Sequence, residues 1–304
     1  MPELSEVEVV RRGLEAHVAG RRIVDVEVSG ARTARRQPGG PAELVDRLVG
    51  RAVTAARRRG KYLWLTLDGD ETSGADCLFV HLGMSGQMLV TDPGVPSPAH
   101  THARAALDDG TELRFVDQRT FGGWTVVPLA AALDGTGVLL PAPAAHVAAD
   151  PFERGFDPVA AARAIRRRDS EVKRLLLDQT VVSGIGNIYA DEALWRSGIH
   201  GRRRAGALTV GAVTGLLGHA RDVMADALAA GGTSFDALYV NVNGASGYFD
   251  RSLDVYGRAG LPCARCGTPV VREEFMNRGS HFCPGCQIPP RRRAAPRAVR
   301  GSVR

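Results

Sequence analysis

Ser183-Gly184-Ile185-Gly186-Asn187-Ile188-Tyr189-Ala190-Asp191-Glu192-Ala193-Leu194 is the stretch that decides the fold of the second half of this chain. Its two glycines permit a tight turn, and the residues after them predict a helix that begins at Asn187 or just after it. Free N–H groups of a first helical turn, together with the Asn187 amide, would form a natural phosphate site. A generic helical hairpin would explain the periodicity of the region but not the Gly-x-Gly-Asn turn.

Helical patterns continue on both sides of this stretch. Upstream, Arg166-Arg167-Arg168 precedes a predicted helix through residues 171–177. Downstream of the Arg202-Arg203-Arg204 loop, apolar residues recur at helical spacing and predict a second helix: Val210, Val213, Leu217, Val223 and Leu228. A long polar loop at 231–247 has the length of a flexible lid. We expect residues 151–250 to form one helical domain.

The first half of the chain has the pattern of a β-rich domain. From residue 22 to about 127, short alternating or apolar runs are separated by Gly, Asp and Pro, as at 23–28 and 61–67. Antiparallel sheets packed as a sandwich would fit this pattern. Residues 128–150 are rich in Ala, Pro and Gly, so we expect the first domain to end near residue 135 and a linker to cover 136–150.

The chain begins Met1-Pro2-Glu3, and removal of Met1 would leave Pro2 as a terminal secondary amine. An α-amino group has a pKa of about 7.7 to 8.0, so a useful fraction is neutral and nucleophilic at physiological pH. Its attack on an aldehyde-level carbon would give a cationic iminium, from which elimination follows. Glu3 would lie within reach as a proton donor. The alternative is that Pro2 and Glu3 only open a helix, where both residue types are favoured.

A short helix is expected to hold this terminus. The Ser5-x-x-Glu8 spacing is typical of a capping box, and an apolar face runs along the helix up to Gly20: Val7, Val10, Leu14 and Val18.

Four cysteines near the end of the chain predict a structural zinc site. Cys263-x2-Cys266 is followed, after sixteen residues, by Cys283-x2-Cys286. Four thiolates leave no open position on the metal, so we expect zinc to organise a hairpin at 251–288 without doing chemistry. Disulfides are the alternative, but a cytosolic chain would keep these thiols reduced. Cys77 is expected to be a buried strand residue.

Charge and composition indicate a cytoplasmic protein with a polyanionic partner. The chain has 304 residues and no apolar run that could span a bilayer. Its net charge of +6 is accounted for by the six arginines of residues 288–304, so 289–304 is expected to be a disordered arm that attracts DNA without reading sequence. Only Lys61 and Lys173 are lysines among 39 basic residues, by chance or because proton transfer needs them.

The run from Met1 to Glu8, the Arg-Gly-Lys-Tyr-Leu segment at 59–63, the turn at 183–194 and the four cysteines together resemble the formamidopyrimidine-DNA glycosylases. These bacterial enzymes remove oxidised purines, and the resemblance spans residues 2 to 287. It implies an α+β multidomain fold: an antiparallel β-sandwich with flanking helices at 1–135, a helix-two-turns-helix domain with a lesion-capping loop, and a β-hairpin zinc finger. The family has proline at position 5, where this chain has Ser5.

The resemblance also implies roles for single residues. Pro2 would attack the anomeric carbon and Glu3 would protonate the sugar ring oxygen. Lys61 would contact phosphate and assist β-elimination, and Arg278 would grip a phosphate and help the second elimination. Met84, Arg119 and Phe121 would fill the space left by an extruded base, although Met84 and Phe121 could equally be core residues. Further residues are implied to contact DNA: Glu6, His100, Arg168, Lys173 and Asn187.

The function expected from these observations is base-excision repair. The protein would act as a monomer on double-stranded DNA, remove 8-oxoguanine and formamidopyrimidines, and leave a one-nucleotide gap by β,δ-elimination. One alternative is the endonuclease VIII branch of the same chemistry, which prefers oxidised pyrimidines. The other is a non-catalytic zinc-finger protein that only binds DNA. The sequence does not rank the oxidised bases.

Overall fold

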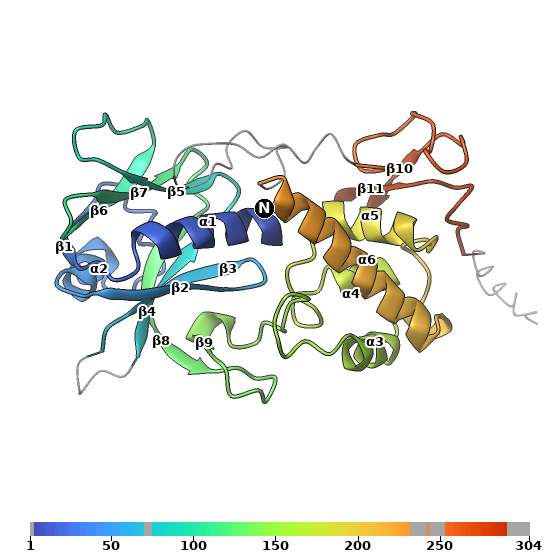
Figure 1. Ribbon diagram of the computed structural model, residues 1–304, viewed down its shortest axis with the longest axis horizontal. Coiled ribbons are helices and arrows are strands. Elements are labelled where there is room, and N and C mark those ends of the chain that lie inside the picture. The colour runs from blue at the N-terminus through green and yellow to red at the C-terminus, as the bar shows by residue number, and fades with distance from the viewer. Residues whose placement is uncertain (1–2, 70–74, 232–241, 243–252, 291–304) are drawn as a thin grey trace, which may run out of the picture.

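The computed structural model describes residues 3–69, 75–231, 242 and 253–290, and it consists of two lobes. Figure 1 shows a β-sandwich on the left, and a group of helices with a small β-hairpin on the right. The N-terminal end of helix α1 lies where the two lobes meet. Among the described residues, no helix is long and apolar enough to cross a membrane.

The first lobe is an antiparallel sandwich, as predicted. One sheet has the strand order β1-β6-β7-β5 and the other the order β2-β3-β4-β8-β9. The strands are β1 Ile23–Val28, β2 Val53–Arg59, β3 Tyr62–Leu67, β4 Asp76–His81, β5 Gly86–Thr91, β6 Thr101–Leu107, β7 Glu112–Asp117, β8 Gly123–Ala131 and β9 Leu139–Pro141. Helix α2 (Gly40–Leu48) packs on this lobe beside β1 and β8.

Both faces of strand β3 are buried, which explains why its sequence is apolar nearly throughout. Leu63 and Leu65 point into the sandwich core, whereas Trp64 belongs to a second cluster on the outer face of the five-stranded sheet. That outer face is covered by residues 139–147, which form β9 and a short 3-10 helix, η1 (Ala142–Ala144). The sequence predicts a linker at 136–150, whereas the structure packs most of this stretch against the sheet because the apolar outer face must be covered.

The second lobe is helical. Helix α5 begins at Asn187, as predicted, and the predicted second helix is α6, which packs against α3 and α5. The helices are α3 Pro158–Arg166, α4 Val172–Leu176, α5 Asn187–Arg196 and α6 Val210–Ala229. A short η2 (Ala205–Ala207) precedes α6. Leucine, valine and alanine side chains from all four helices form one buried core.

Helix α1 (Leu4–His17) joins the lobes. Leu4 packs into the core of the helical lobe, whereas Val7, Val10 and Leu14 pack into the sandwich core. The helix starts two residues earlier than the predicted Ser5 cap, because Glu3 is the N-cap and the Glu6 carboxylate accepts a hydrogen bond from the Glu3 backbone at 2.7 Å. The first helix of the described chain is therefore held by contacts to both lobes.

The β-hairpin consists of β10 (Val271–Phe275) and β11 (Arg278–Phe282). Its two turn residues, Met276 and Asn277, both have positive φ, as a two-residue hairpin turn requires. Arg278 follows this turn as the first residue of β11.

Candidate active site

Glu3 lies against the N-terminus of helix α5. The backbone N–H of Ile188 donates to Glu3 Oε1 at 3.1 Å, and the N–H of Tyr189 donates to Oε2 at 3.4 Å. The sequence predicts phosphate at this helix end, but these two groups already bind a carboxylate, so that prediction is corrected for them. Gly186 makes the approach possible, because a Cβ there would lie 2.1 Å from Glu3 Cδ.

The environment of Glu3 gives it a pKa of about 7. Burial raises the pKa, the Lys61 ammonium lowers it, and the Glu6 carboxylate raises it again. The two backbone hydrogen bonds from α5 lower the pKa of Glu3, but not enough to cancel the effect of burial. A carboxyl group with this pKa is partly protonated at neutral pH and can give or take a proton there. Pro2, its neighbour in sequence, lies outside the described residues.

Lys61 lies in the tight turn between β2 and β3, half-buried and close to Glu3. Burial lowers its pKa, while Glu3 and Glu6 counteract this effect. The turn is held by Asp150, which is fully buried: its Oδ2 accepts from the Gly60 N–H at 3.1 Å and from Arg58 Nη1 at 2.5 Å. A lysine with a lowered pKa is more often neutral at physiological pH and can then accept a proton.

Arg278 reaches the same region from the hairpin of the second lobe. Its guanidinium is exposed and lies close enough to Lys61 to lower the pKa of that amine further. Asn187 positions the hairpin, since its Nδ2 donates to the Gly279 carbonyl at 2.8 Å. The structure therefore brings Glu3, Lys61 and Arg278 together.

Lys173 does not lie on the DNA-facing surface that the sequence predicts for it. It is fully buried, and its Nζ lies 2.5 Å from Asp191 Oδ1. Asp191 also accepts hydrogen bonds from Ser280 Oγ at 3.2 Å and from the His281 N–H at 2.8 Å. The prediction of a DNA contact is wrong for Lys173, because its ammonium is used to hold β11 against α4 and α5.

Glu6 is also buried, and its carboxylate faces the interior at the start of α1. The remaining predicted DNA contacts lie apart from it. His100 is exposed at the start of β6, with a positive φ of 66°. Arg168 is exposed after α3 and lies 3.3 Å from Asp178.

Two neighbouring turns carry the predicted wedge residues. Phe121 is 46% exposed, Arg119 is exposed, and Met84 is half-buried. The Arg119 guanidinium lies 5.2 Å from the centre of the Phe121 ring. Gly83 (φ +64°) allows the turns to touch, because a Cβ there would lie 2.7 Å from the Gly122 nitrogen. Phe121 is therefore not a core residue.

The turn between β7 and β8, which carries Arg119 and Phe121, is fixed by residues that sequence reasoning missed. Buried Asp117 accepts hydrogen bonds from the backbone of Arg119 at 3.2 Å and of Gly122 at 2.7 Å. Arg35 donates to the carbonyls of Thr120 at 2.9 Å and of Phe121 at 2.5 Å. Nothing in the sequence around Arg35 distinguishes it from other surface arginines.

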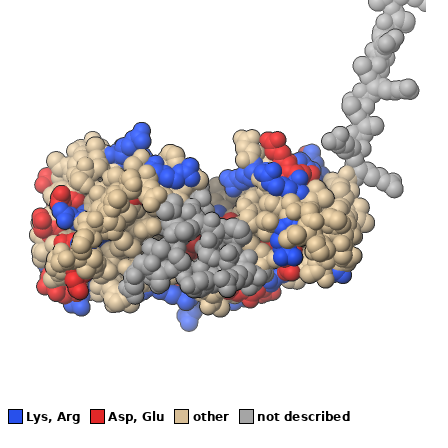
Figure 2. All heavy atoms as spheres, turned by 90° about the horizontal axis from the view of Figure 1, so that it is seen from above, with Lys and Arg blue, Asp and Glu red and all other residues tan. Residues whose placement is uncertain are grey.

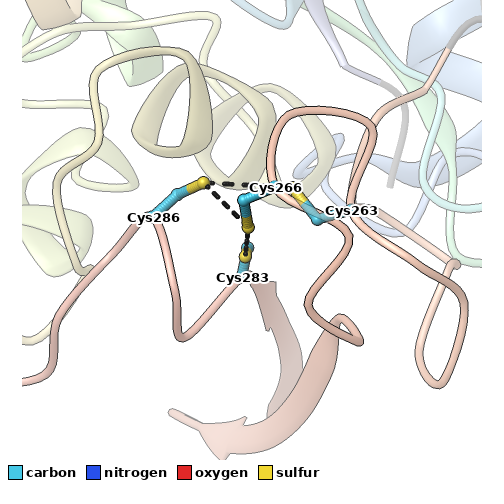
Figure 3. Close-up of side chains that lie close together, drawn as sticks. All are labelled: Cys263, Cys266, Cys283 and Cys286. Atoms are coloured by element: carbon cyan, nitrogen blue, oxygen red, sulfur yellow. Dashed lines mark hydrogen bonds between the residues drawn. The ribbon is translucent and has the colours of Figure 1, made fainter.

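The four cysteines form the predicted metal site. Their sulfur atoms all lie within 4.8 Å of one another, and Figure 3 shows them converging from two loops. Cys266 and Cys283 are 3.4 Å apart and Cys263 and Cys286 are 3.9 Å apart. Tetrahedral zinc with bonds of about 2.3 Å needs sulfurs about 3.8 Å apart, so the site fits this metal. Cys77 is buried in β4, and burial raises its pKa to about 12.

Basic side chains occur on both lobes of the molecule. Figure 2 shows them on either side of the middle of the face seen from above. Arg119 belongs to the first lobe and Arg278 to the second, and both are exposed. A polyanion that binds across the middle would meet cations from both lobes.

Fold and site together define a zinc-finger enzyme that acts on DNA. Three family models match the chain: the formamidopyrimidine-DNA glycosylase N-terminal domain at residues 1–124, the H2TH domain of the same enzymes at 147–238, and the zinc finger found in FPG and IleRS at 260–288. The chain belongs to the formamidopyrimidine-DNA glycosylase family. Its helical lobe and cysteine hairpin are thus the predicted helix-two-turns-helix domain and zinc finger.

Similar proteins cover the whole chain. The formamidopyrimidine-DNA glycosylase of Nocardia farcinica is 62% identical, and the match covers 96% of this chain and 100% of the relative. That of Mycobacterium avium is 59% identical with the same coverage. A Lactococcus lactis FPG mutant bound to DNA with Fapy-dG has a TM-score of 0.80 at 29% identity over 95% of this chain and 100% of the other. The Lactococcus lactis complex with abasic-site DNA has a TM-score of 0.78 at 29% identity, over 94% and 99%.

Proposed function

We propose that this protein is a base-excision repair enzyme that removes oxidised purines from duplex DNA and then cuts the strand at the abasic site. The observation that carries the proposal is the pair formed by buried Glu3, which has a pKa of about 7, and half-buried Lys61, whose pKa is lowered. Relatives named formamidopyrimidine-DNA glycosylase and neighbours solved with Fapy-dG and abasic-site DNA support it. Such an enzyme would work in the bacterial cytoplasm, where the DNA lies.

The first step is base release. After removal of Met1, the Pro2 nitrogen attacks the anomeric carbon of the extruded nucleotide, and a carbon–nitrogen bond forms as the glycosidic bond breaks. The base leaves with the bonding electrons and takes up, through water, the proton that the Pro2 nitrogen loses after its attack. Protonated Glu3 gives its proton to the ring oxygen as the sugar opens, which leaves a cationic iminium on Pro2. Burial keeps enough Glu3 protonated at neutral pH for this transfer.

Strand cleavage follows by two eliminations. Neutral Lys61 removes the proton next to the iminium carbon, and the 3′ phosphate leaves with the electron pair of the breaking bond. A second elimination releases the 5′ phosphate, and the Arg278 guanidinium stabilises the charge on this leaving group. Hydrolysis of the iminium by water frees Pro2 and releases the remnant of the sugar, which leaves a one-nucleotide gap. Zinc, when bound by the four cysteines, holds the hairpin that presents Arg278 and takes no part in these steps.

Extrusion of the base needs the exposed wedge. Phe121 and Met84 would fill the vacated stack, and Arg119 would hydrogen-bond the orphaned partner base. His100, Arg168 and the remaining hydrogen-bonding capacity of Asn187 would contact the phosphate backbone. These contacts draw on both lobes, in keeping with the basic side chains on either side of the middle.

Borohydride trapping on duplex DNA with 8-oxoguanine opposite cytosine tests this function. Reduction of the iminium would fix the protein covalently to the DNA, and the mass of the adduct would locate it at Pro2. The matched control carries an extended N-terminus, which removes the free secondary amine. Equal trapping by the extended protein would overturn the role of Pro2, and faster release from oxidised pyrimidines would favour the endonuclease VIII alternative. Binding without trapping or base release would favour a non-catalytic protein.

A further inference from the structure

Ser5 is a buried residue in the first turn of α1, and its hydroxyl faces α5 of the other lobe. Ser5 Oγ is hydrogen-bonded to the hydroxyl of Tyr189, which is also fully buried. On its other side, Ser5 Oγ lies 3.2 Å from Glu6 Oε1. The second oxygen of Glu6 accepts the backbone N–H of Glu3 at 2.7 Å. A continuous chain of hydrogen bonds therefore runs from α5 to the backbone of Glu3.

The donor and acceptor in each of these hydrogen bonds follow from the number of protons that each group can give. A carboxylate has no proton to give, so Ser5 donates its single proton to Glu6. The bond between Ser5 and Tyr189 must then use the Tyr189 proton. Burial raises the pKa of Tyr189, so the phenol keeps this proton at neutral pH. Each hydroxyl thus has one defined role, and removing either one breaks the chain.

We propose that Ser5 and Tyr189 are positioning residues that hold the Glu6 carboxylate in place beside Glu3. This inference rests on the proposed function, in which Glu3 is the proton donor. Ser5 stands where the family resemblance places proline, which carries no hydroxyl. The hydrogen bonds of the Ser5 hydroxyl therefore depend on the residue that this protein has at position 5.

Several titratable groups lie around Glu3 and Glu6. Lys61 approaches from the turn between β2 and β3, Tyr189 from α5, and Tyr256 from the segment after residue 252, while Arg278 of the hairpin acts on Lys61. The negative charge of Glu6 itself acts to raise the pKa of Glu3. In a variant without the Ser5 hydroxyl, Glu6 Oε1 loses a hydrogen-bond donor while Oε2 keeps the Glu3 N–H. The carboxylate is then held less firmly beside Glu3, and the pKa of Glu3 falls.

The test is the pH dependence of single-turnover base release by Ser5→Ala, Tyr189→Phe and the double variant. The alkaline limb of the profile should move toward lower pH by about half a unit or more in each single variant, the scale expected when a hydrogen bond to a charged group is lost. The double variant should show the same shift as either single one, because both break one chain. Ser5→Pro should match Ser5→Ala. Thr54→Ala, which removes an exposed hydroxyl paired with Thr66 at 2.7 Å, is the matched control.

Each result decides the matter. Unmoved limbs in the single variants, additive shifts in the double variant, or an equal shift in Thr54→Ala would overturn the positioning role. If Ser5→Ala does not fold, Tyr189→Phe alone carries the test, since it removes the other hydroxyl of the same bond. The proposed function fails separately: it is overturned if the wild-type protein releases no base or if Glu3→Gln keeps full activity.

Discussion

Glu3 and Phe121 belong to the same proposed site, but they differ in their contact with water. Glu3 is 7% exposed and receives two backbone hydrogen bonds from α5, whereas Phe121 is 46% exposed on a turn that Asp117 and Arg35 fix through its backbone. The difference separates two tasks. Proton transfer needs a carboxyl group whose pKa is shifted by burial. Wedging needs an apolar side chain that is free to enter the DNA.

The comparison implies that the two residues differ in their effect on the free energy of folding. A buried carboxyl with a raised pKa lowers the free energy of unfolding when it becomes ionised at alkaline pH. An exposed phenylalanine loses little when the protein unfolds, because much of its surface is already in water. We therefore expect substitutions of Glu3 to change both activity and stability, and substitutions of Phe121 to change activity alone.

Glu3→Gln should have the largest effect. Glutamine keeps the shape but has no transferable proton, so base release should fall by roughly 10²- to 10⁴-fold. In the wild type, the rate should fall about tenfold per unit above pH 7, because Glu3 loses its proton there. Single-turnover kinetics on 8-oxoguanine duplexes measure both. Glu27→Gln, which alters an exposed ion pair with Arg104, is the control, and a Glu3→Gln protein with near-normal rates would refute the assignment.

Removal of the metal should have the next largest effect. Without zinc the hairpin loses its fixed fold and Arg278 loses its place, so duplex affinity should fall by roughly 30-fold or more. Fluorescence anisotropy with and without chelator measures this. Circular dichroism should show the strands of the sandwich retained, because its core contains none of the four cysteines. Cys77→Ala should bind normally, and unchanged affinity in chelator would contradict the role of the hairpin.

Phe121→Ala should have a smaller effect on activity. The loss of one stacking contact costs about 1–3 kcal/mol, which corresponds to roughly 5- to 150-fold in catalytic efficiency. The melting temperature should hardly change because the ring is half in water. Val24→Ala, at a strand position that is 50% exposed, controls for loss of surface apolar area. A large drop in melting temperature would mean that Phe121 supports the fold after all.

The last expected effect is on stability and not on activity. The pKa of Glu3 is raised from 4.5 to about 7, so the folded state binds more protons than the unfolded state in this window. The stability contributed by protonated Glu3 is full below pH 4.5 and is lost as pH rises through 7, by up to about 3 kcal/mol. Glu3→Gln should therefore be more stable than the wild type at pH 8 and similar at pH 5. Urea unfolding at the two pH values checks this, and equal curves at pH 8 would contradict it.

Local patterns in the sequence were sufficient for much of the fold. The Gly-x-Gly-Asn turn predicted the start of α5 at Asn187, and the alternating runs predicted the strands, because both signals depend on neighbouring residues. The Cys-x2-Cys spacing predicted the metal site for the same reason. Glu3, Lys61 and Arg278 were named from the family resemblance, and the structure brings them together.

Contacts between distant segments were not predictable in this way. Lys173 was expected to contact DNA from the family resemblance. The short segment 171–177 does not reveal which of its two cations is buried, because the partner of Lys173, Asp191, lies in another helix. The Glu3 carboxylate takes the N–H groups that were expected to bind phosphate, because α1 and α5 meet only in the folded protein. Arg35 and Asp117 were missed since backbone contacts leave no pattern in the sequence.

The hydrogen bond between Glu3 and Ile188 joins residues 185 positions apart in the chain. The ribosome therefore makes the proton donor almost first and its backbone partners much later. A nascent chain in which α5 has not yet been synthesised contains Glu3 but not the helix end that orients it. Under the proposed function, the part of the site that joins Glu3 to α5 is therefore assembled only after residues 187–196 have been synthesised.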